Sequence, residues 1–463
     1  MKIYTVLLFL LFHPIIFSQN VESSIMTLDE YLGYVKQFHP TVKQANLQVS
    51  QSQAAIMQAR GGFDPKIEID YLTKQFKSKE YYTILNSAFK IPTWYGIEVK
   101  AAFDSSQGSF LNPEDNLPPN GLSSLGISIP LGQGLFINQR MASLRQAKIF
   151  NTLTIAERDL EVVNILSEAA KSYINWYRNY TEYKLYETFF NNATVRFKGI
   201  RGLISAGDKP AIDSVEAGII VKNRKLNLEQ SRIKVIKSGL ELSNFLWLEN
   251  NIPFELQPNI IPEENLENSI AETLKVNGFN EINLENHPKI ISLQNKVKIL
   301  EIEKRLKGDL LKPRVDFNYN YIAQNPVALQ NFNNDNYKYG LSFSYPLFLR
   351  KERGSFRIAK FKLENAILDF DFENVSLRNK INAQIQEVNS LREQIKIATE
   401  LVIDFETMLN SEERLFFFGE SSIFLINARE NSLLGSSLQK IDIYIRYFNS
   451  QADLFRIRAI PVN

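Results

Sequence analysis

The sequence predicts an internally duplicated α+β protein in which each half combines alternating strands with a long helical hairpin. Three observations support this prediction. The pair His39-Pro40 recurs as His287-Pro288, and a second proline follows each histidine at the same distance, at Pro65 and Pro313. Each of these later prolines begins a run in which apolar and polar residues alternate. Each half then continues into a proline-free stretch of about 65 residues with helical periodicity.

The N-terminus predicts a signal peptide over residues 1–18. Lys2 precedes an apolar run from Ile3 to Phe17, and the small residue Ser18 ends that run. A membrane anchor is the alternative, but the run is shorter than the roughly 20 residues that a spanning helix needs. No other segment is a candidate transmembrane helix. We therefore expect an exported chain that is either soluble or a β-barrel.

Composition narrows the possible functions. Lys and Arg total 53 against 51 for Asp and Glu, so the near-neutral chain gives no indication of a nucleic-acid partner. Cysteine is absent, which excludes disulfides, thiolate metal sites and a lipid-modified cysteine.

The first helical segment is expected over residues 27–60, and its counterpart in the second half over 286–311. Thr27 and Glu30 have the spacing of a capping box. Proline suits the first turn of a helix and pushes the preceding residue toward extended geometry. Each His-Pro pair is thus predicted to mark a break and a restart of the helix. Metal binding is the weaker alternative for these histidines, because no other ligand lies near them in the sequence.

Strands are expected over 65–130 in the first half and 313–347 in the second. In "KIEIDYL" the apolar residues Ile67, Ile69 and Tyr71 alternate with charged ones, which predicts a sheet with two different faces. A soluble sandwich and a membrane barrel both produce this pattern, although long polar loops favour the barrel. The first half has room for four strands, with an additional hairpin near 81–104. The second half has room for only two.

Helical hairpins are predicted over 140–246 and 353–455. Apolar residues in both long helices follow coiled-coil heptads. Each long helix ends at a glycine, Gly207 or Gly419, and a shorter helix returns. The segments over 27–60 and 286–311 have the length needed to continue the two returning helices along their long partners.

This organisation resembles the TolC-like outer-membrane efflux proteins over essentially the whole mature chain. The resemblance is carried by the paired "HP" segments, the strands after Pro65 and Pro313, the strand exits "IPLGQG" and "YPLFLR", and the glycine turns before "DSVEAG" and "INAREN". It implies an α+β membrane protein, a homotrimer whose strands form one shared β-barrel in outer-membrane lipid. The helices then form a coiled-coil tunnel through the periplasm. Residues 19–246 would be the first repeat, 247–285 an equatorial belt or linker, and 286–463 the second repeat.

The additional hairpin departs from the family pattern of two strands in each half. It leaves the number of barrel strands open, since the hairpin could lie in the barrel wall or outside it.

The resemblance also implies a gate where the tunnel narrows at the periplasmic tips. Counting from the two glycines, the pore-lining candidates are Asp213, Glu216, Leu425 and Ala428. Three copies of the two acids around one axis would repel each other and attract cations. Alternatively, both are ordinary helix N-terminal acids favoured by the helix dipole. For docking of an adaptor protein, the candidate residues are those of the tip turns, Gly207, Asp208, Gly419, Glu420, Ser421 and Ser422.

The function predicted from this resemblance is a passive exit duct of a tripartite efflux or type I secretion system. A periplasmic adaptor and an inner-membrane transporter would deliver cargo to it. The alternative is a periplasmic coiled-coil protein with a structural or adaptor role. An enzyme is the least supported class, because the sequence has no phosphate-binding loop, nucleophile motif or metal-ligand cluster. We expect no catalytic residues, no cofactor and no metal.

Overall fold

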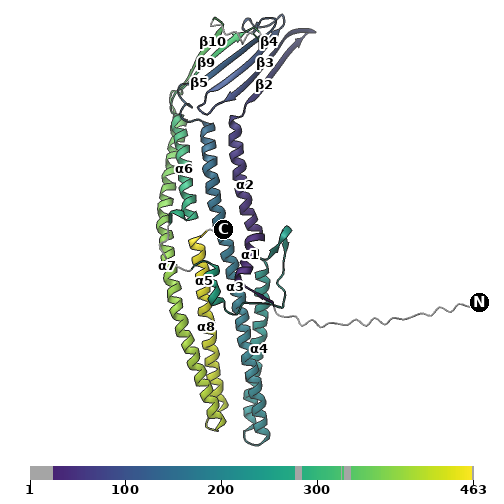
Figure 1. Cartoon of the computed structure of the whole chain (residues 1–463), viewed down its shortest axis with the longest axis vertical. Coiled ribbons are helices and arrows are strands. Elements are labelled where there is room, and N and C mark those ends of the chain that lie inside the picture. The colour runs from purple at the N-terminus through teal and green to yellow at the C-terminus, as the bar shows by residue number, and fades with distance from the viewer. Residues whose placement is uncertain (1–23, 277–283, 325, 328–334, 461–463) are drawn as a thin grey trace, which may run out of the picture. The chain divides into compact units, whose positions relative to one another are not determined.

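The computed structural model describes residues 24–276, 284–324, 326–327 and 335–460, so the expected signal peptide lies outside the described residues. Its helices are α1 (Leu28–Phe38), α2 (Pro40–Arg60), α3 (Gln139–Ser205), α4 (Ala211–Ser243), α5 (Leu266–Thr273), α6 (Pro288–Asp309), α7 (Arg350–Phe417) and α8 (Ile423–Arg458). Figure 1 labels these elements along the chain. Within the described ranges, no helix combines the length and the apolar character needed to cross a bilayer.

Both His-Pro pairs begin a helix, as the sequence predicts. His39 and His287 have extended backbone geometry, and the proline after each occupies the first helical turn. The Nδ1 atom of His39 accepts a hydrogen bond from the N–H of Thr41 (3.2 Å), and that of His287 accepts one from Lys289 (3.1 Å). Each imidazole therefore caps a helix N-terminus by satisfying a free backbone donor.

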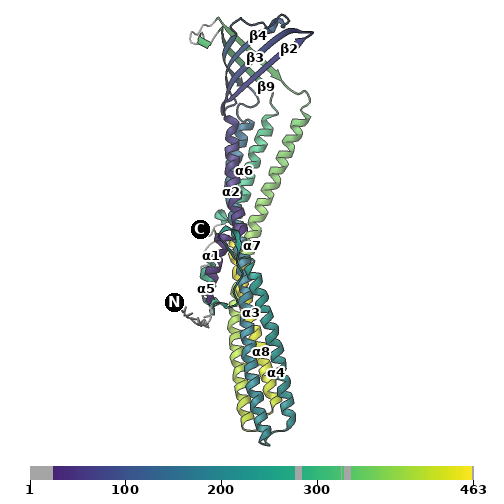
Figure 2. The ribbon, with the colours of Figure 1, turned by 90° about the vertical axis from the view of Figure 1, so that its right-hand side faces the viewer.

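The strands of the two halves form one six-stranded sheet. They are β2 (Lys66–Phe76), β3 (Lys79–Pro92), β4 (Glu98–Gln107), β5 (Leu122–Pro130), β9 (Arg314–Ala323) and β10 (Tyr337–Ser344). Their order is β10-β9-β5-β4-β3-β2, and all neighbours are antiparallel (Figures 1 and 2). β5 and β9 join the halves, with Leu125 opposite Tyr321. The sheet therefore depends on both repeats.

The additional hairpin of the first half belongs to this sheet. β3 pairs with β2 on one side and with β4 on the other, from Thr83 opposite Gln107 to Pro92 opposite Glu98. Among the described residues, the first half thus contributes to the sheet the four strands for which its sequence has room, and the second half contributes two. Within the chain, the hairpin continues the sheet and does not lie apart from it.

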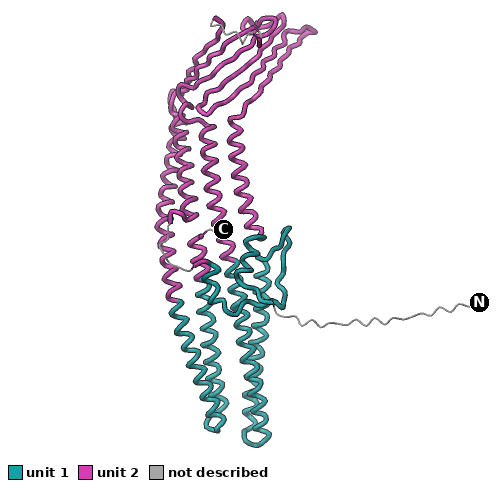
Figure 3. Tube along the Cα trace, viewed as in Figure 1, with its two compact units in different colours: residues 1–38, 169–274, 391–449 teal, residues 39–168, 275–390, 450–463 magenta. Residues whose placement is uncertain are grey.

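The chain divides into two compact units, and each draws segments from both halves (Figure 3). Unit 1 comprises residues 1–38, 169–274 and 391–449, and unit 2 comprises 39–168, 275–390 and 450–463. Unit 2 contains the sheet, α2 and α6. Unit 1 contains α1, α4, α5 and both turns between long and returning helices.

Most of the described segment between the halves belongs to unit 1 and contains short strands and α5. β8 (Ile260–Pro262) pairs in parallel with β1 (Ser24–Met26), and β6 (Trp247–Leu248) pairs with β7 (Ile252–Pro253). The hydroxyl of Tyr173 in α3 donates to the carbonyl of Met26 (2.7 Å) and accepts from the N–H of Glu263 (3.2 Å). Burial raises the pKa of Tyr173, which keeps this hydroxyl neutral. The part of 247–285 that the structure describes is therefore anchored to α3.

In unit 2, the buried side chain of His287 makes a further contact through its other ring nitrogen. The Nε2 atom of His287 lies 2.8 Å from the carbonyl oxygen of Ile457 in α8. Since Nδ1 already accepts a bond, Nε2 carries the proton and donates it to this carbonyl. Burial lowers the pKa of His287 below its ordinary value. Ile457 and Ile290 also pack in one apolar cluster with Leu377 and Ile381 of α7. The second His-Pro pair thus joins α6 to the end of α8.

Candidate functional site

The two turns at the ends of the long helices, which we call the tips, have the same backbone geometry. Gly207 and Gly419 have φ angles of 82° and 80°, in the left-handed region that favours glycine. The N–H of each glycine bonds the carbonyl three residues earlier, and the next N–H bonds the carbonyl five residues earlier. This pair of bonds is the Schellman motif that ends a helix. The glycine signals in the sequence therefore correspond to real helix ends.

The remaining tip residues differ between the two turns. Asp208 and Glu420 follow the glycines and are exposed. In the second tip, Ser422 caps α8, because its hydroxyl accepts from the N–H of Leu425 (3.3 Å). Ser421 donates to the carboxylate of Glu412, a buried residue of α7 that also accepts from Nε of Arg429 (3.4 Å). The second tip is thus fixed by side chains as well as by its backbone.

The gate candidates lie at the beginnings of α4 and α8. Asp213 and Glu216 are half-buried, whereas Leu425 and Ala428 are exposed. The carboxylate of Glu216 accepts a hydrogen bond from the amide of Asn427 (3.2 Å), the residue before Ala428. The structure therefore brings Glu216 beside the α8 candidates. The pore-lining role of all four residues remains a prediction.

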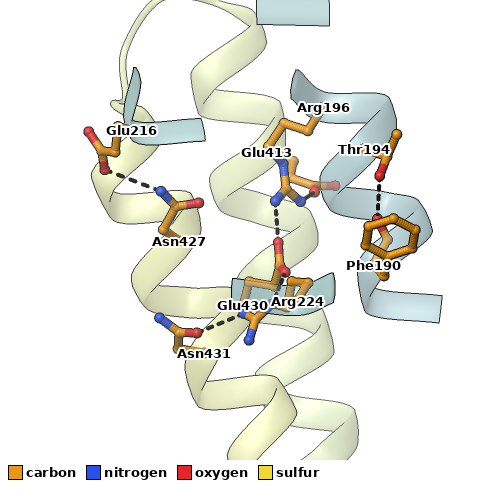
Figure 4. A network of polar contacts seen from close by, with 9 residues as sticks. All are labelled: Phe190, Thr194, Arg196, Glu216, Arg224, Glu413, Asn427, Glu430 and Asn431. Carbon is orange, nitrogen blue, oxygen red and sulfur yellow. Dashed lines mark hydrogen bonds and ion pairs between the residues drawn. The ribbon is translucent and has the colours of Figure 1, made fainter. Parts of the chain in front are cut away.

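A buried ion-pair network connects the helices close to the tips (Figure 4). Glu430 of α8 is 1% exposed and binds two arginines, Arg196 of α3 and Arg224 of α4. Nε of Arg224 lies 3.2 Å from Oε1 of Glu430, and its Nη2 donates to Asn431 (2.7 Å). Arg196 also donates to Glu413 of α7 (2.8 Å). One carboxylate thus joins both hairpins of unit 1.

The network balances its own charges. Two guanidinium groups, those of Arg196 and Arg224, face the two carboxylates of Glu413 and Glu430. Burial alone would lower the pKa of Arg196, but the carboxylates of Glu430 and Glu413 outweigh burial and raise it. The arginine therefore stays charged in its half-buried position. Sequence inspection missed this network because its members lie more than 200 positions apart on the two hairpins.

The second tip also carries exposed aromatic rings, another feature that the sequence analysis did not identify. Phe417 is 85% exposed, Phe418 is 73% exposed and Phe424 is 67% exposed. Their neighbour Phe416 instead packs against the buried cluster of Ile200, Ala217 and Ile423, and the ammonium group of Lys209 lies 4.6 Å from its ring centre. The signal was available in the letters "FFFG", since consecutive phenylalanines at a helix end cannot all face one buried side.

The sheet has one apolar and one polar face across all six strands. A row of directly paired residues on the apolar face runs from edge to edge through Ile67, Phe89, Ala101, Leu125, Tyr321 and Tyr337. Ile67 is 74% exposed and Leu341, on the same face of β10, is 65% exposed. Such a broad exposed apolar surface is typical of contact with lipid or another protein.

The opposite face carries charges of both signs. Another row of directly paired residues contains Lys66, Lys90, Lys100, Gly126, Asn320 and Lys338. Acids occupy neighbouring rows of this face, and Glu68 forms an ion pair with Lys90. This face is suited to contact with water.

The helix α4 exposes an apolar stripe. Its members lie on one side at heptad-like steps of three, four and seven residues and are Ile212, Val215, Ile219, Leu226, Ile233, Ile236 and Leu240. A heptad stripe of this kind is the usual contact surface of a coiled coil.

Among the described residues, no group of three or more acidic or imidazole side chains could hold a metal ion.

No protein-family model matches the sequence. A search of curated proteins likewise gives no match.

Solved structures of outer-membrane channels share the fold. The CmeC outer membrane channel of Campylobacter jejuni is 12% identical with a TM-score of 0.64, covering 93% of this chain and 85% of CmeC. The open state of the Neisseria gonorrhoeae MtrE channel is 12% identical, with a TM-score of 0.64 and coverages of 93% and 88%. The Vibrio cholerae outer membrane protein VceC is 14% identical, with a TM-score of 0.64 and coverages of 93% and 95%. The resemblance predicted from the sequence is confirmed at the level of the fold.

Proposed function

We propose that this chain is the outer-membrane exit duct of a tripartite efflux or type I secretion system and works as a homotrimer. The two-faced sheet is the observation that carries the proposal. Every strand contributes to an apolar face suited to lipid and to a charged face suited to a water-filled passage. A soluble periplasmic coiled-coil protein, the alternative function, would have to cover that apolar face with another protein.

The edges of the sheet support assembly from several copies. Lipid does not tolerate unpaired backbone groups, so a sheet in the membrane must close into a barrel. Eight strands give an interior only just wide enough to be filled with side chains, and the described part of this chain supplies six to the sheet. Several copies are therefore needed to form a passage. The apolar stripe of α4 gives such copies a matching contact surface in the helical region.

The tips support the docking of an adaptor. A complete Schellman motif fixes the backbone of each turn, and the turns present Asp208, Glu420 and exposed phenylalanine rings. An adaptor bound here would deliver cargo from an inner-membrane pump. The duct itself needs no catalytic residue, since the pump supplies the energy.

Cross-linking at the second tip tests the proposal. Because the chain has no cysteine, Ser422→Cys supplies a unique thiol for a thiol-to-amine cross-linker in living cells. We expect mass spectrometry to identify a periplasmic adaptor whose partner is an inner-membrane pump. Ser78→Cys, in the β2–β3 turn, is the matched control and should capture no adaptor. Self-links alone at Ser422→Cys, or none, would contradict the adaptor-fed duct.

A further inference from the structure

The two edge strands of the sheet, β2 and β10, each have one pairing partner among the described residues. We propose that β2 of one copy pairs with β10 of the next, so that three copies close a barrel of eighteen strands, six from each copy. The β2–β3 hairpin then supplies the edge at which neighbouring copies join. This inference rests on the proposed function, since it takes the trimer and the membrane location from it.

Strand direction permits this joint. Every neighbouring pair in the sheet is antiparallel, and an even number of strands means that β2 and β10 run in opposite directions. Copies related by rotation about one axis present β10 of one to β2 of the next. The new pair is therefore antiparallel as well, and the closed barrel keeps one uniform hydrogen-bonding pattern.

The faces of the sheet match across the joint. The apolar row reaches both edges, at Ile67 in β2 and Tyr337 in β10, and the lysine-containing row also ends at both edges, at Lys66 and Lys338. Joining the edges keeps lipid-facing and water-facing residues on their own sides. The strands are also long enough, since β2 has 11 residues and β10 has 8.

The hairpin is held in the plane of the sheet by more than its ladder. β3 and β4 pair from Pro92 to Thr83. The loop after β4 also returns to β3, where the N–H of Phe110 donates to the carbonyl of Tyr81 (3.1 Å) and the two rings stack 4.6 Å apart. A Cβ at Gly108 would lie 2.4 Å from that carbonyl oxygen, so the loop approaches as closely as glycine allows. These contacts argue against a hairpin that folds outside the wall.

The extra strands would widen the exit. Barrel diameter grows roughly linearly with strand number, so eighteen strands give about one and a half times the diameter of a barrel with four strands from each of three copies. Barrels of 16–18 strands leave an aqueous channel.

Paired cysteines in the cysteine-free chain test the joint directly. Tyr339→Cys on β10 is combined in turn with Ile67→Cys, Ile69→Cys or Tyr71→Cys on β2, all on the apolar face. The matched control combines Tyr339→Cys with Val99→Cys on β4, two strands inward from the edge. Oxidised outer membranes are examined on non-reducing gels, and the native mass of the unoxidised protein is measured in parallel.

We expect covalent dimers and trimers for at least one β2 position and none for Val99→Cys. In the joined barrel, β4 lies three strand spacings from β10 of the neighbouring copy, about 14 Å, which is beyond the roughly 7 Å that a disulfide spans between Cα atoms. Covalent dimers and trimers that form only with Val99→Cys would place the hairpin outside the barrel wall. That result would overturn the inference, while the exit duct would stand. A membrane trimer that links at no β2 position would overturn it too. If no outer-membrane trimer exists, both proposals fail.

Hydrogen exchange on the unmodified protein gives an independent test. In a lone copy, the β2 amides that point away from β3 meet solvent, whereas in the joint they are bonded to β10. We expect residues 66–76 in the lipid-embedded protein to be as strongly protected as residues 98–107 of β4. Rapid exchange of about half the β2 amides would overturn the inference.

Discussion

Arg224 of α4 and Glu430 of α8 form a buried ion pair, with Nε 3.2 Å from Oε1, and Arg196 of α3 shares the same carboxylate. One acid that is 1% exposed therefore binds two arginines of the other helical hairpin of unit 1. Removing one partner of a buried ion pair leaves an uncompensated charge in a poorly solvated environment, which destabilises the fold. The behaviour of these hairpins should accordingly depend on this side chain more than on nearby surface charges.

Replacing Glu430, the acid that both arginines share, should strongly lower the free energy of unfolding. We expect Glu430→Gln to cost about 3–5 kcal/mol, because the buried Arg224 and the half-buried Arg196 lose their common carboxylate. The matched control is Glu413→Gln, which removes a more exposed partner of Arg196 and should cost under about 1 kcal/mol. Denaturant unfolding followed by circular dichroism measures both. Equal losses for the two variants would contradict the assigned role of Glu430.

The tip glycines should resist substitution although space around them is open. A Cβ at Gly207 or Gly419 would meet nothing within 4 Å, but both residues have positive φ. Alanine at either position should cost about 1–2 kcal/mol through backbone strain alone. Gly435→Ala, inside α8 and equally open, should instead stabilise by about 0.5–1 kcal/mol. In thermal melting, the two tip variants should have a lower melting temperature than the unmodified protein, and Gly435→Ala should have a higher one.

Stability should fall in mild acid because of His287. Burial lowers its pKa in the folded state, so the unfolded chain binds the proton more tightly. The stability that neutral His287 contributes is fully present above about pH 6.5, the pKa of histidine in the unfolded chain. It is lost as the pH falls toward the lower pKa of the folded state. The loss in melting temperature between pH 7.5 and pH 5.5 should shrink in His287→Asn, which can still cap α6. An unchanged pH dependence in that variant would exclude this histidine as the cause.

The two faces of the sheet should respond differently to the same substitution. Leu125→Lys on the apolar face should cost about 2–4 kcal/mol in the membrane if this position lies near the bilayer centre. Ser128→Lys, on the opposite face of the same strand and paired with Glu98, should be nearly neutral. The measurement is the yield of folded protein in the outer-membrane fraction, which should be lower for Leu125→Lys than for Ser128→Lys. Equal yields would argue that the apolar face does not meet lipid.

Much of the fold follows from local sequence signals. The His-Pro caps, the glycines at both tips and the period-two strands act over a few residues, and each is read directly from neighbouring letters. The long helices predicted from about 140 and 353 begin at Gln139 and Arg350. The predicted cap at Thr27 is present, since its hydroxyl accepts from the N–H of Glu30 (3.2 Å).

Features that depend on distant segments were not predictable in the same way. The pairing of β5 with β9, and with it the order of the sheet, brings together residues almost 200 positions apart. The charges of Arg196, Arg224 and Glu430 look like ordinary helix-surface charges in the sequence, because heptad patterns do not reveal which polar position becomes buried. The Glu216 contact with Asn427 likewise exists only once the two hairpins pack.

Labelling from outside the cell tests the central claim, an outer-membrane duct, most directly. Ser78 lies in the turn between β2 and β3 of the sheet, whereas Ser422 lies at the second tip. In intact cells, a maleimide attached to a large polyethylene glycol should label Ser78→Cys, and it should label Ser422→Cys only after the outer membrane is permeabilised. Equal labelling of the two variants in intact cells would contradict a chain that crosses the outer membrane with its tips in the periplasm.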